Sequence, residues 1–252
     1  MQVMTTPSKS FERDSAFEGL DHFLRDSQCK TSVADVLESL KRYAALYRIE
    51  AMAYYFLPPA GASDHAERYV YVSGFGDSAL KTRSLVSNPL MQKSTKLTRA
   101  LFWNEVATEL ALTAEQNAQL KTIYCADGDN GLVVPGHGPN GRNACFVMRF
   151  SACVGSFSRQ DIRILKLACQ AVHEHICVLR QDSRKNQVRL TRREREVMSW
   201  VARGKSNRDI ATIVGISPHT VNGYLRRIYL KTGTNDRTTA TLRVLGDSLI
   251  DY

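Results

Sequence analysis

Apolar positions in the first part of the chain change from helical spacing to strand spacing. Residues 33–48 (VADVLESLKRYAALYR) carry apolar side chains three and four apart, and Ser32 is placed as an N-cap, so a helix is predicted there. Two runs rich in aromatic and β-branched residues, 51–57 and 68–73, predict strands joined by a polar loop. Residues 77–126 then show a mostly helical, irregular pattern.

The pattern returns to strands before a last long helix. Thr113 opens one clear helix inside the irregular region. Residues 131–134 and 144–151 predict strands on either side of a turn at 135–141 (PGHGPNG), and 158–179 form a long amphipathic pattern. This order of elements predicts an antiparallel sheet with helices on both faces, an α/β/α sandwich of the kind found in small sensory domains.

Beyond residue 188 the pattern is purely helical and closely punctuated. Residues 191–194 (TRRE) form a capping box, in which a hydroxyl and a carboxylate satisfy backbone N–H groups, and Leu190 is placed as the hydrophobic staple. The helix that follows runs to Arg203 and stops at Gly204. Residues 206–209 (SNRD) repeat the cap and open a short helix that ends near Gly215.

A third helix begins with Ser217 as N-cap and Pro218 at the first helical position, and Gly233 stops it. A last helix is predicted from about 236 to 249. Only residues 215–217 join the second and third helices, a turn short enough to force a sharp crossing. The spacing therefore predicts a helix-turn-helix.

These patterns predict an α+β protein with two domains and an uneven charge. We expect an N-terminal domain at 18–180, a polar linker at 181–188 and an all-α four-helix domain at 189–252. Residues 184–252 hold 14 Lys and Arg against 6 Asp and Glu, whereas residues 1–183 hold 20 against 19. A basic domain on a near-neutral body points to a polyanionic partner, nucleic acid before membrane.

Several classes of protein are disfavoured. Residues 1–17 lack the apolar core of a secretory signal, and no run approaches the roughly 20 apolar residues of a membrane span. The six cysteines have no CxxC spacing and are typical of reduced thiols in a cytoplasmic protein. The glycine-rich residues 135–141 lack the Lys of a phosphate loop, and residues 1–35 lack the strand and paired acids of a receiver domain. We expect no enzyme activity and no cofactor.

Cys169, His173 and Cys177 recur every four residues, so they share one face of the predicted long helix. Such residues could bind zinc, but three ligands on one straight helix rarely converge on one metal. We therefore favour packing against the sheet or at a dimer interface, and expect no metal site.

The C-terminal segment carries a denser signal than a helix-turn-helix spacing alone. Residues 190–237, LTRREREVMSWVARGKSNRDIATIVGISPHTVNGYLRRIYLKTGTNDR, closely resemble the LuxR-type DNA-binding domain. The resemblance implies four helices, with the third in the major groove and the fourth serving dimerisation. It also implies a sequence-specific transcription regulator that binds double-stranded DNA as a homodimer or as a heterodimer with a related regulator.

The predicted third helix has a core face and a DNA face. Val221, Leu225 and Ile228 share one face and should be buried. The candidate DNA-contacting residues are Lys205, Asn207, Thr220, Asn222, Gly223, Tyr224, Arg226 and Arg227. Arg226 can bond a guanine in bidentate fashion, and Asn222 suits adenine or a phosphate. The resemblance implies base contacts for 222, 223 and 226 and often places a Lys at position 222.

Upstream, about residues 20–180 resemble the autoinducer-binding domain of quorum-sensing LuxR regulators. The anchors are Asn88-Pro89, Phe102-Trp103 and residues 131–135 (GLVVP). The resemblance implies that Asn88 stands where an Asp usually accepts a hydrogen bond from the ligand amide, and that Trp103 flanks the lactone ring.

Other pocket positions depart from the family pattern. Segment 75–87 (FGDSALKTRSLVS) contains neither of two aromatic residues that contact the ligand in the family. Arg149 lies near the position of a small polar residue and should share a strand face with Cys145 and Val147. A buried Arg149 would need an anion, either a ligand carboxylate or a nearby Asp such as Asp127 or Asp129.

Two readings of the N-terminal domain follow from these departures. We expect a domain that resembles an acyl-homoserine-lactone sensor but does not bind a standard lactone, or that works without ligand. The alternative is a conventional quorum-sensing regulator activated by an acyl-homoserine lactone. A small-molecule ligand of another kind, contacted by Asn88, Trp103 and Arg149, fits the first reading.

Overall fold

The computed structural model describes residues 9–57, 70–75, 88–124, 130–150, 158–182, 188–246 and 249–250. The chain divides into two compact units. The first contains the described residues as far as Leu179, except Gly138–Arg142. The second contains Gly138–Arg142 and the described residues from Arg180 onward.

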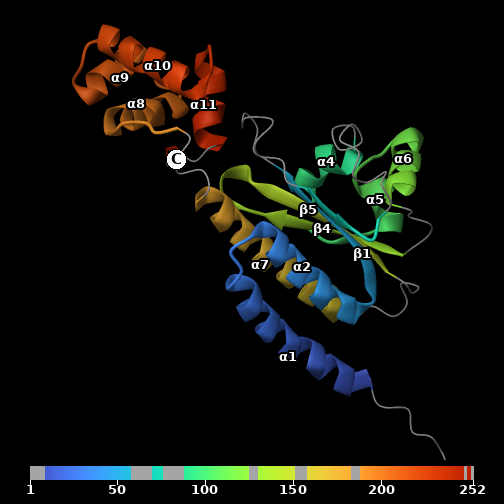
Figure 1. Ribbon diagram of the computed structural model, residues 1–252. Coiled ribbons are helices and arrows are strands. Elements are labelled where there is room, and N and C mark those ends of the chain that lie inside the picture. The colour runs from blue at the N-terminus through green and yellow to red at the C-terminus, as the bar shows by residue number, and fades with distance from the viewer. Residues whose placement is uncertain are drawn as a thin grey trace, which may run out of the picture. The chain divides into compact units, whose positions relative to one another are not determined.

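An antiparallel five-stranded sheet forms the centre of the first unit (Figure 1). The strands are β1 (Ile49–Leu57), β2 (Val70–Ser73), β3 (Leu101–Phe102), β4 (Gly131–His137) and β5 (Asn143–Phe150), in the order β2-β1-β5-β4-β3. The central strand β5 pairs with β1 on one side and β4 on the other, so that Phe146 lies opposite both Tyr54 and Val134.

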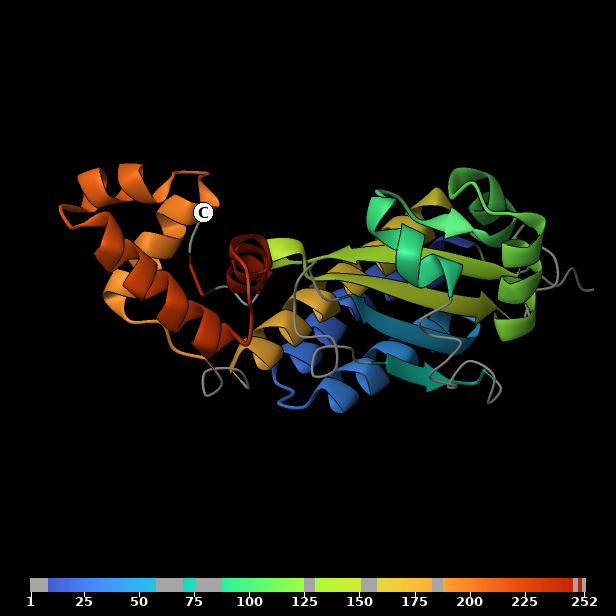
Figure 2. The ribbon, with the colours of Figure 1, turned by 90° about the horizontal axis from the view of Figure 1, so that it is seen from above.

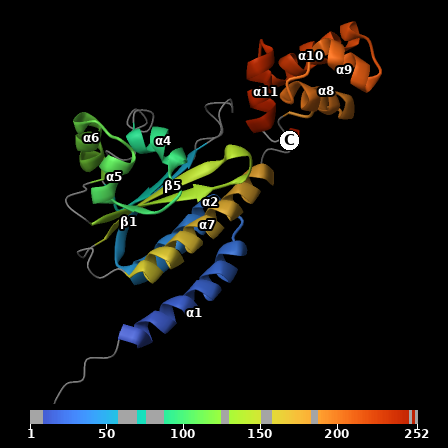
Figure 3. The same cartoon turned by 180° about the vertical axis from the view of Figure 1, so that it is seen from behind.

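Helices cover both faces of this sheet, as the sequence predicted. One face carries α1 (Lys9–Gln28), α2 (Val33–Ala44), the 3-10 turn η1 (Ala45–Tyr47) and α7 (Arg159–Asp182). The other carries α4 (Pro89–Lys93), η3 (Ser94–Lys96), α5 (Trp103–Glu109) and α6 (Ala114–Tyr124). Figure 2 shows the green helices α4 to α6 together on one side of the sheet, and Figure 3 shows α1 as the outermost helix of the other side.

Alternation along β5 builds a separate apolar core on each face. Phe146 and Met148 pack with α2 and α7, whereas Cys145 and Val147 pack with α4, α5 and α6. Successive side chains of a strand point to opposite faces, so a strand covered on both sides must be apolar at nearly every position. This explains why β5 lacks the polar-apolar alternation of a half-exposed strand.

The second unit contains four helices, α8 (Arg192–Ala202), α9 (Asn207–Val214), α10 (Pro218–Thr232) and α11 (Arg237–Gly246), and the 3-10 turn η4 (Pro139–Gly141). The predicted capping boxes are present at the starts of α8 and α9. Gly215 and Gly233 end α9 and α10 with φ of 72° and 64°, a left-handed conformation that glycine adopts at little cost.

Several element ends differ from the sequence predictions. The helix α1 was not predicted. Helix α7 continues to Asp182, into the expected linker, and residues 183–187 of that linker lie outside the described residues. Strand β4 runs on to His137, through the first residues of the predicted turn. Helix α11 is described from Arg237 to Gly246, and residues 247–248 lie outside the described residues. Pro135 is tolerated in β4 because β3 pairs only with Leu132 and Val133, leaving an edge there.

Candidate DNA-contacting surface and ligand site

The apolar face of α10 is buried as predicted. Val221, Leu225 and Ile228 have exposed fractions of 0%, 4% and 0% and belong to the core of the helical unit. At the start of α10 the Ser217 hydroxyl accepts a hydrogen bond from the Thr220 N–H at 3.0 Å. The burial of one face fixes which residues of α10 face outward.

Four residues that the sequence assigned to DNA are exposed on α10. Asn222, Arg226 and Arg227 are exposed, as is Thr220. Tyr224 is half-buried, and the Arg227 guanidinium lies 4.6 Å from the centre of its ring. In this position Arg227 packs on Tyr224 and still presents its charge to solvent.

Gly223 stands between these residues with open space around it. A Cβ added there would meet no atom within 4 Å. The fold itself therefore does not require glycine at this helical position, where glycine costs stability. The absence of a side chain lowers the outer surface of α10 between Asn222 and Arg226.

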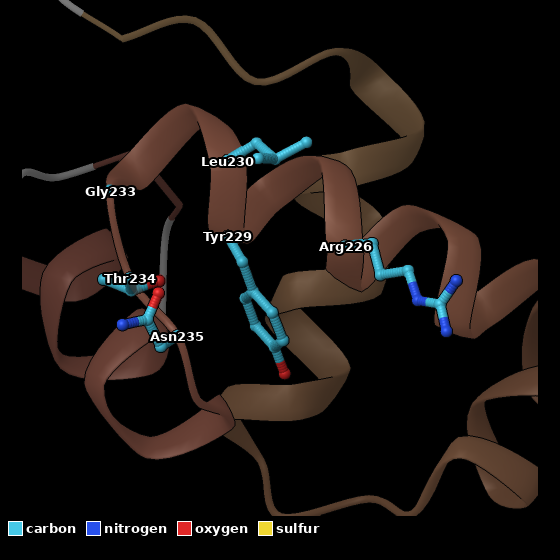
Figure 4. A pocket seen from close by; sticks show the side chains of 6 residues that line it. All are labelled: Arg226, Tyr229, Leu230, Gly233, Thr234 and Asn235. Carbon is cyan, nitrogen blue, oxygen red and sulfur yellow. The ribbon is translucent and has the colours of Figure 1, made fainter.

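A groove of about 530 Å³ lies along the second half of α10. Its lining residues are Arg226, Tyr229, Leu230, Gly233, Thr234 and Asn235 (Figure 4). Figure 4 shows the Arg226 side chain extended away from the helix and from Tyr229. Within the described residues Arg226 makes no ion pair or hydrogen bond, so its five donors are available to a partner.

Two candidate residues outside α10 lie at the start of α9. Lys205 is exposed, and its backbone carbonyl accepts a hydrogen bond from Arg237. Asn207 is half-buried, and its side chain contacts both Arg237 of α11, at 2.8 Å, and Asn222 of α10, at 2.6 Å. Arg237 was not among the candidate residues predicted from the sequence. The helix dipole disfavours a cation at the start of a helix, so the position of Arg237 at the start of α11 indicates a local hydrogen-bond partner.

An ion pair fixes α10 against α8. Lys231 Nζ lies 2.6 Å from a Glu194 carboxylate oxygen, and the same carboxylate accepts the Thr191 N–H at 2.7 Å. Burial opposes ionisation of Glu194, but the hydrogen bonds from Lys231 and Thr191 outweigh it and lower the pKa of this carboxyl below its ordinary value.

In the first unit, Asn88 is buried and bonded at both ends of its amide. Its carbonyl oxygen accepts the Leu90 N–H at 3.0 Å and so caps α4, and its nitrogen donates to the Tyr124 hydroxyl at 2.6 Å. Tyr124 in turn donates to Tyr55 at 2.8 Å. Burial raises the pKa of both tyrosines well above the ordinary value, so both stay protonated. Asn88-Pro89 is thus an N-cap signal as well as a family anchor.

Trp103 lies beside this cluster with a free donor. Its side chain is 8% exposed, its ring centre is 5.4 Å from that of Tyr124, and its Nε1 has no hydrogen-bond partner in the described structure. A Cβ on Gly131 would lie 2.2 Å from the indole. The glycine of the GLVVP anchor is therefore needed to seat Trp103.

Arg149 shares its strand face with Cys145 and Val147, as predicted, but it is not buried. It is half-exposed, donates to the Gly74 carbonyl at 3.2 Å and lies 5.4 Å from the centre of the Phe75 ring. The expectation that Arg149 needs a buried anion was wrong, because solvent and these two groups satisfy it. Asp127, Asp129 and the segment 76–87 lie outside the described residues.

The three residues with metal-ligand spacing are buried in the core on one face of α7, which fits the packing interpretation. His173 contacts the Tyr54 hydroxyl through Nδ1 at 3.0 Å and Cys177 through Nε2 at 3.6 Å, and Cys169 is fully buried. No group of three or more His, Cys, Asp or Glu side chains in the described part of the chain is arranged to hold a metal.

Among the described helices none has the length and apolarity that a bilayer crossing requires.

Comparison with known proteins assigns both units. Residues 32–176 match the family model for the autoinducer binding domain, and residues 188–244 match that for bacterial regulatory proteins of the luxR family. The structure is similar to Escherichia coli SdiA, with a TM-score of 0.70 at 16% identity over 94% of this chain and 99% of that one. It is also similar to SdiA in complex with octanoyl-rac-glycerol, with a TM-score of 0.67 at 17% identity and full coverage of both chains.

Curated relatives are regulators as well. The chain is 27% identical to the putative HTH-type transcriptional regulator y4qH of Sinorhizobium fredii over 75% of this chain and 58% of that protein. It is 27% identical to the transcriptional activator protein AhyR of Aeromonas hydrophila over 66% of each, and 34% identical to the quorum-sensing regulator RhlR of Pseudomonas aeruginosa over 44% of this chain and 47% of that protein. The chain thus spans about three fifths to two thirds of the length of the first two relatives.

With a core that contains Asn88 and Trp103 and a helix-turn-helix in α9 and α10, the chain belongs to the luxR family of transcription regulators that carry an autoinducer binding domain.

Proposed function

We propose that the protein is a dimeric regulator that reads a specific DNA sequence with the outward face of α10. The observation that carries this proposal is the division of α10 into a buried face and an exposed face. Val221, Leu225 and Ile228 hold the helix in the core, while Asn222 and Arg226 are exposed on the other side. A helix presented in this way fits the major groove, where amide and guanidinium groups distinguish base edges.

Phosphate contacts come from the positions around α10. Lys205, Asn207, Thr220 and Tyr224 border its exposed face, and Arg227 adds a second guanidinium. Such contacts fix the orientation of the helix on the duplex, whereas the base contacts supply specificity. The excess of positive charge in residues 184–252 supplies the attraction to the DNA backbone.

Dimerisation is the second part of the proposal. One helix-turn-helix reads too few base pairs to select a site in a genome, so two copies must act together. Leu242 on α11 is 42% exposed, and Leu167 and Val178 on α7 are 57% and 53% exposed. These apolar side chains on the last helix of each unit support contacts between copies of this chain, or with a related regulator.

For the ligand, we propose that the N-terminal domain does not bind a standard acyl-homoserine lactone or acts without one. The Asn88 carbonyl is aimed at the Leu90 N–H and its nitrogen at Tyr124, so neither end of the amide is aimed at a ligand N–H. Near Asn88 the described residues hold two unpartnered buried polar groups, the Trp103 indole N–H and the Ser94 hydroxyl. The indole can hold a lactone carbonyl, but the Asn88 carbonyl, which the resemblance implies as the acceptor for the ligand amide, is already used by the Leu90 N–H.

The second candidate is a conventional regulator activated by an acyl-homoserine lactone. The unpartnered Trp103 N–H favours it, because an indole N–H in a core usually finds a partner and a ligand carbonyl would supply one. RhlR is named a quorum-sensing regulator, and SdiA was solved with octanoyl-rac-glycerol.

One experiment separates the two candidates. Full-length protein, purified without added ligand, is incubated with a randomised duplex library, and the bound sequences are determined. The first candidate predicts enrichment of a two-fold symmetric sequence without ligand, and the second predicts enrichment only after N-octanoyl-homoserine lactone is added. Enrichment of no sequence under either condition would refute DNA reading.

A further inference from the structure

Three polar side chains link the first residues of α9 and α11 to the outward face of α10. Arg237 donates through Nη1 to Asn207 Oδ1 at 2.8 Å, and Asn207 donates through Nδ2 to Asn222 Oδ1 at 2.6 Å. Arg237 is further anchored by its hydrogen bond to the Lys205 carbonyl. The three side chains form a relay that ends at a candidate base-reading residue.

The direction of this relay is fixed by the chemistry of its members. A guanidinium has donors and no acceptor, so the Asn207 atom that faces Arg237 must be the carbonyl oxygen. The Asn207 nitrogen therefore faces Asn222, and the atom that it meets there must also be a carbonyl oxygen. The hydrogen bonds run from Arg237 to Asn222 and cannot reverse while Arg237 is in place.

The consequence for Asn222 is that its carbonyl oxygen is turned toward Asn207 and its amide nitrogen remains available to donate. Its carbonyl points at Asn207, and its amide nitrogen belongs to an exposed side chain with no other partner in the described structure. The charge on Arg237 strengthens the first bond of the chain, and polarisation along the chain strengthens the second. Asn222 therefore presents N–H groups to a partner, while its carbonyl oxygen is held toward Asn207 and has one lone pair left.

We propose that the Arg237–Asn207 relay turns the carbonyl of Asn222 toward α9, so that this residue reads guanine in preference to adenine. An asparagine pairs with adenine by accepting from N6 and donating to N7, and this needs both ends of the amide. Guanine presents O6 and N7, two acceptors that the Asn222 N–H groups satisfy. The choice differs from the adenine preference that the residue type alone suggests. Arg237 and Asn207 act here as positioning residues, and the inference rests on the proposed function, which places α10 in the major groove.

The test compares base preferences of full-length variants selected on the same randomised duplex library. The operator position that loses its preference in Asn222→Ala is assigned to residue 222. In the wild type we expect guanine at this position. In Asn207→Ala the Asn222 carbonyl is released, and the adenine-to-guanine ratio should rise by about tenfold, within the range that one bidentate pair provides. Arg237→Ala should shift the ratio in the same direction by a smaller factor, because Asn207 can then turn either way.

Asn222→Lys supplies the matched control. A lysine only donates and needs no relay, so adding Asn207→Ala in that background should leave the base preference unchanged. This comparison separates the relay from a general disturbance of α9, which would change both backgrounds alike. The melting temperature of each variant, measured in parallel, shows that the helical unit is folded during selection.

The outcomes distinguish this inference from the proposed function. If the wild type enriches no sequence, DNA reading by α10 fails and the inference fails with it. If it enriches a sequence but Asn207→Ala selects the same base as the wild type at the assigned position, DNA reading stands and the relay is refuted. Adenine at that position in the wild type, or no position that depends on Asn222, would refute the relay as well.

Discussion

Lys231 Nζ lies 2.6 Å from a carboxylate oxygen of Glu194. The Glu194 side chain is only 2% exposed, whereas that of Lys231 is 36% exposed. The pair joins the last turn of α10 to the capping box of α8. It therefore holds the C-terminal part of α10 against the rest of the helical unit.

Removing the ammonium should leave the Glu194 carboxylate buried and uncompensated. We expect Lys231→Met to lower the free energy of unfolding of the helical unit by about 1–3 kcal/mol. Arg193→Met is the control, because the Arg193–Glu196 pair on the same helix is exposed at 55% and 40% and should be worth about 1 kcal/mol or less. Denaturant unfolding followed by Trp200 fluorescence in a Trp103→Phe background reports on this unit alone. Equal losses in the two variants would contradict the argument.

The same pair makes stability depend on pH in acid. The folded-state pKa of Glu194 lies below its ordinary value of 4.5. The pair's stabilisation is therefore present above the unfolded pKa and is lost as the pH falls through the folded pKa. The stability difference between the wild type and Lys231→Met should be constant near neutral pH and shrink below about 4.5. A difference that stays constant down to pH 3 would show that Glu194 titrates normally.

DNA binding should depend steeply on salt. A dimer that neutralises about 6–10 phosphates should lose about three to five decades in affinity between about 50 and 200 mM salt.

Arg226→Ala should cost about 1–3 kcal/mol of binding free energy and weaken the base preference at one operator position, whereas Lys205→Ala should weaken binding to all sequences alike. Titrations of a selected and a scrambled duplex at several salt concentrations measure both effects. Identical sequence profiles for the two variants would remove the assignment of Arg226 to a base.

Local signals predicted most of the helical unit. Ser217 and the capping boxes at 191–194 and 206–209 are short-range patterns, and each capping bond joins residues three apart. Their physics is contained within one turn of helix, so the sequence predicts it directly. The apolar face of α10 follows from helical periodicity in the same way.

The side-chain contacts on which the proposals rest were not predictable from such patterns. Asn207 meets Asn222 and Arg237, which are 15 and 30 positions away, and only the packing of three helices brings them together. Tyr124 reaches Asn88 across 36 positions in the first unit. A buried Arg149 was inferred from its strand face alone, but its place near the end of β5, beside Gly74, leaves it half-exposed.

The ligand proposal makes a prediction about Asn88. The melting temperature of the wild type should change little with micromolar N-octanoyl-homoserine lactone, because two or three missing hydrogen bonds, at about 0.5–1.5 kcal/mol each, cost about one to three decades of affinity. In Asn88→Asp one carboxylate oxygen can keep the Leu90 cap while the other accepts from a ligand N–H, so the lactone should raise the melting temperature. Asn88→Ala, which has no acceptor, is the control. A rise of several degrees in the wild type would show that the pocket binds the lactone through other contacts.

Gly223 allows stability and DNA binding to be separated in one variant. A Cβ at this position meets nothing within 4 Å, so Gly223→Ala should stabilise α10 by about 0.5–1 kcal/mol through helix propensity alone. If α10 enters the major groove, the added methyl stands between Asn222 and Arg226 and holds the helix away from the base edges. DNA affinity should therefore fall while the melting temperature rises. Gly131→Ala provides the contrast, because its Cβ would lie 2.2 Å from the Trp103 indole and should destabilise the first unit. A Gly223→Ala protein that is more stable and binds the selected duplex as tightly as the wild type would place the centre of the DNA contact on another part of the helical unit.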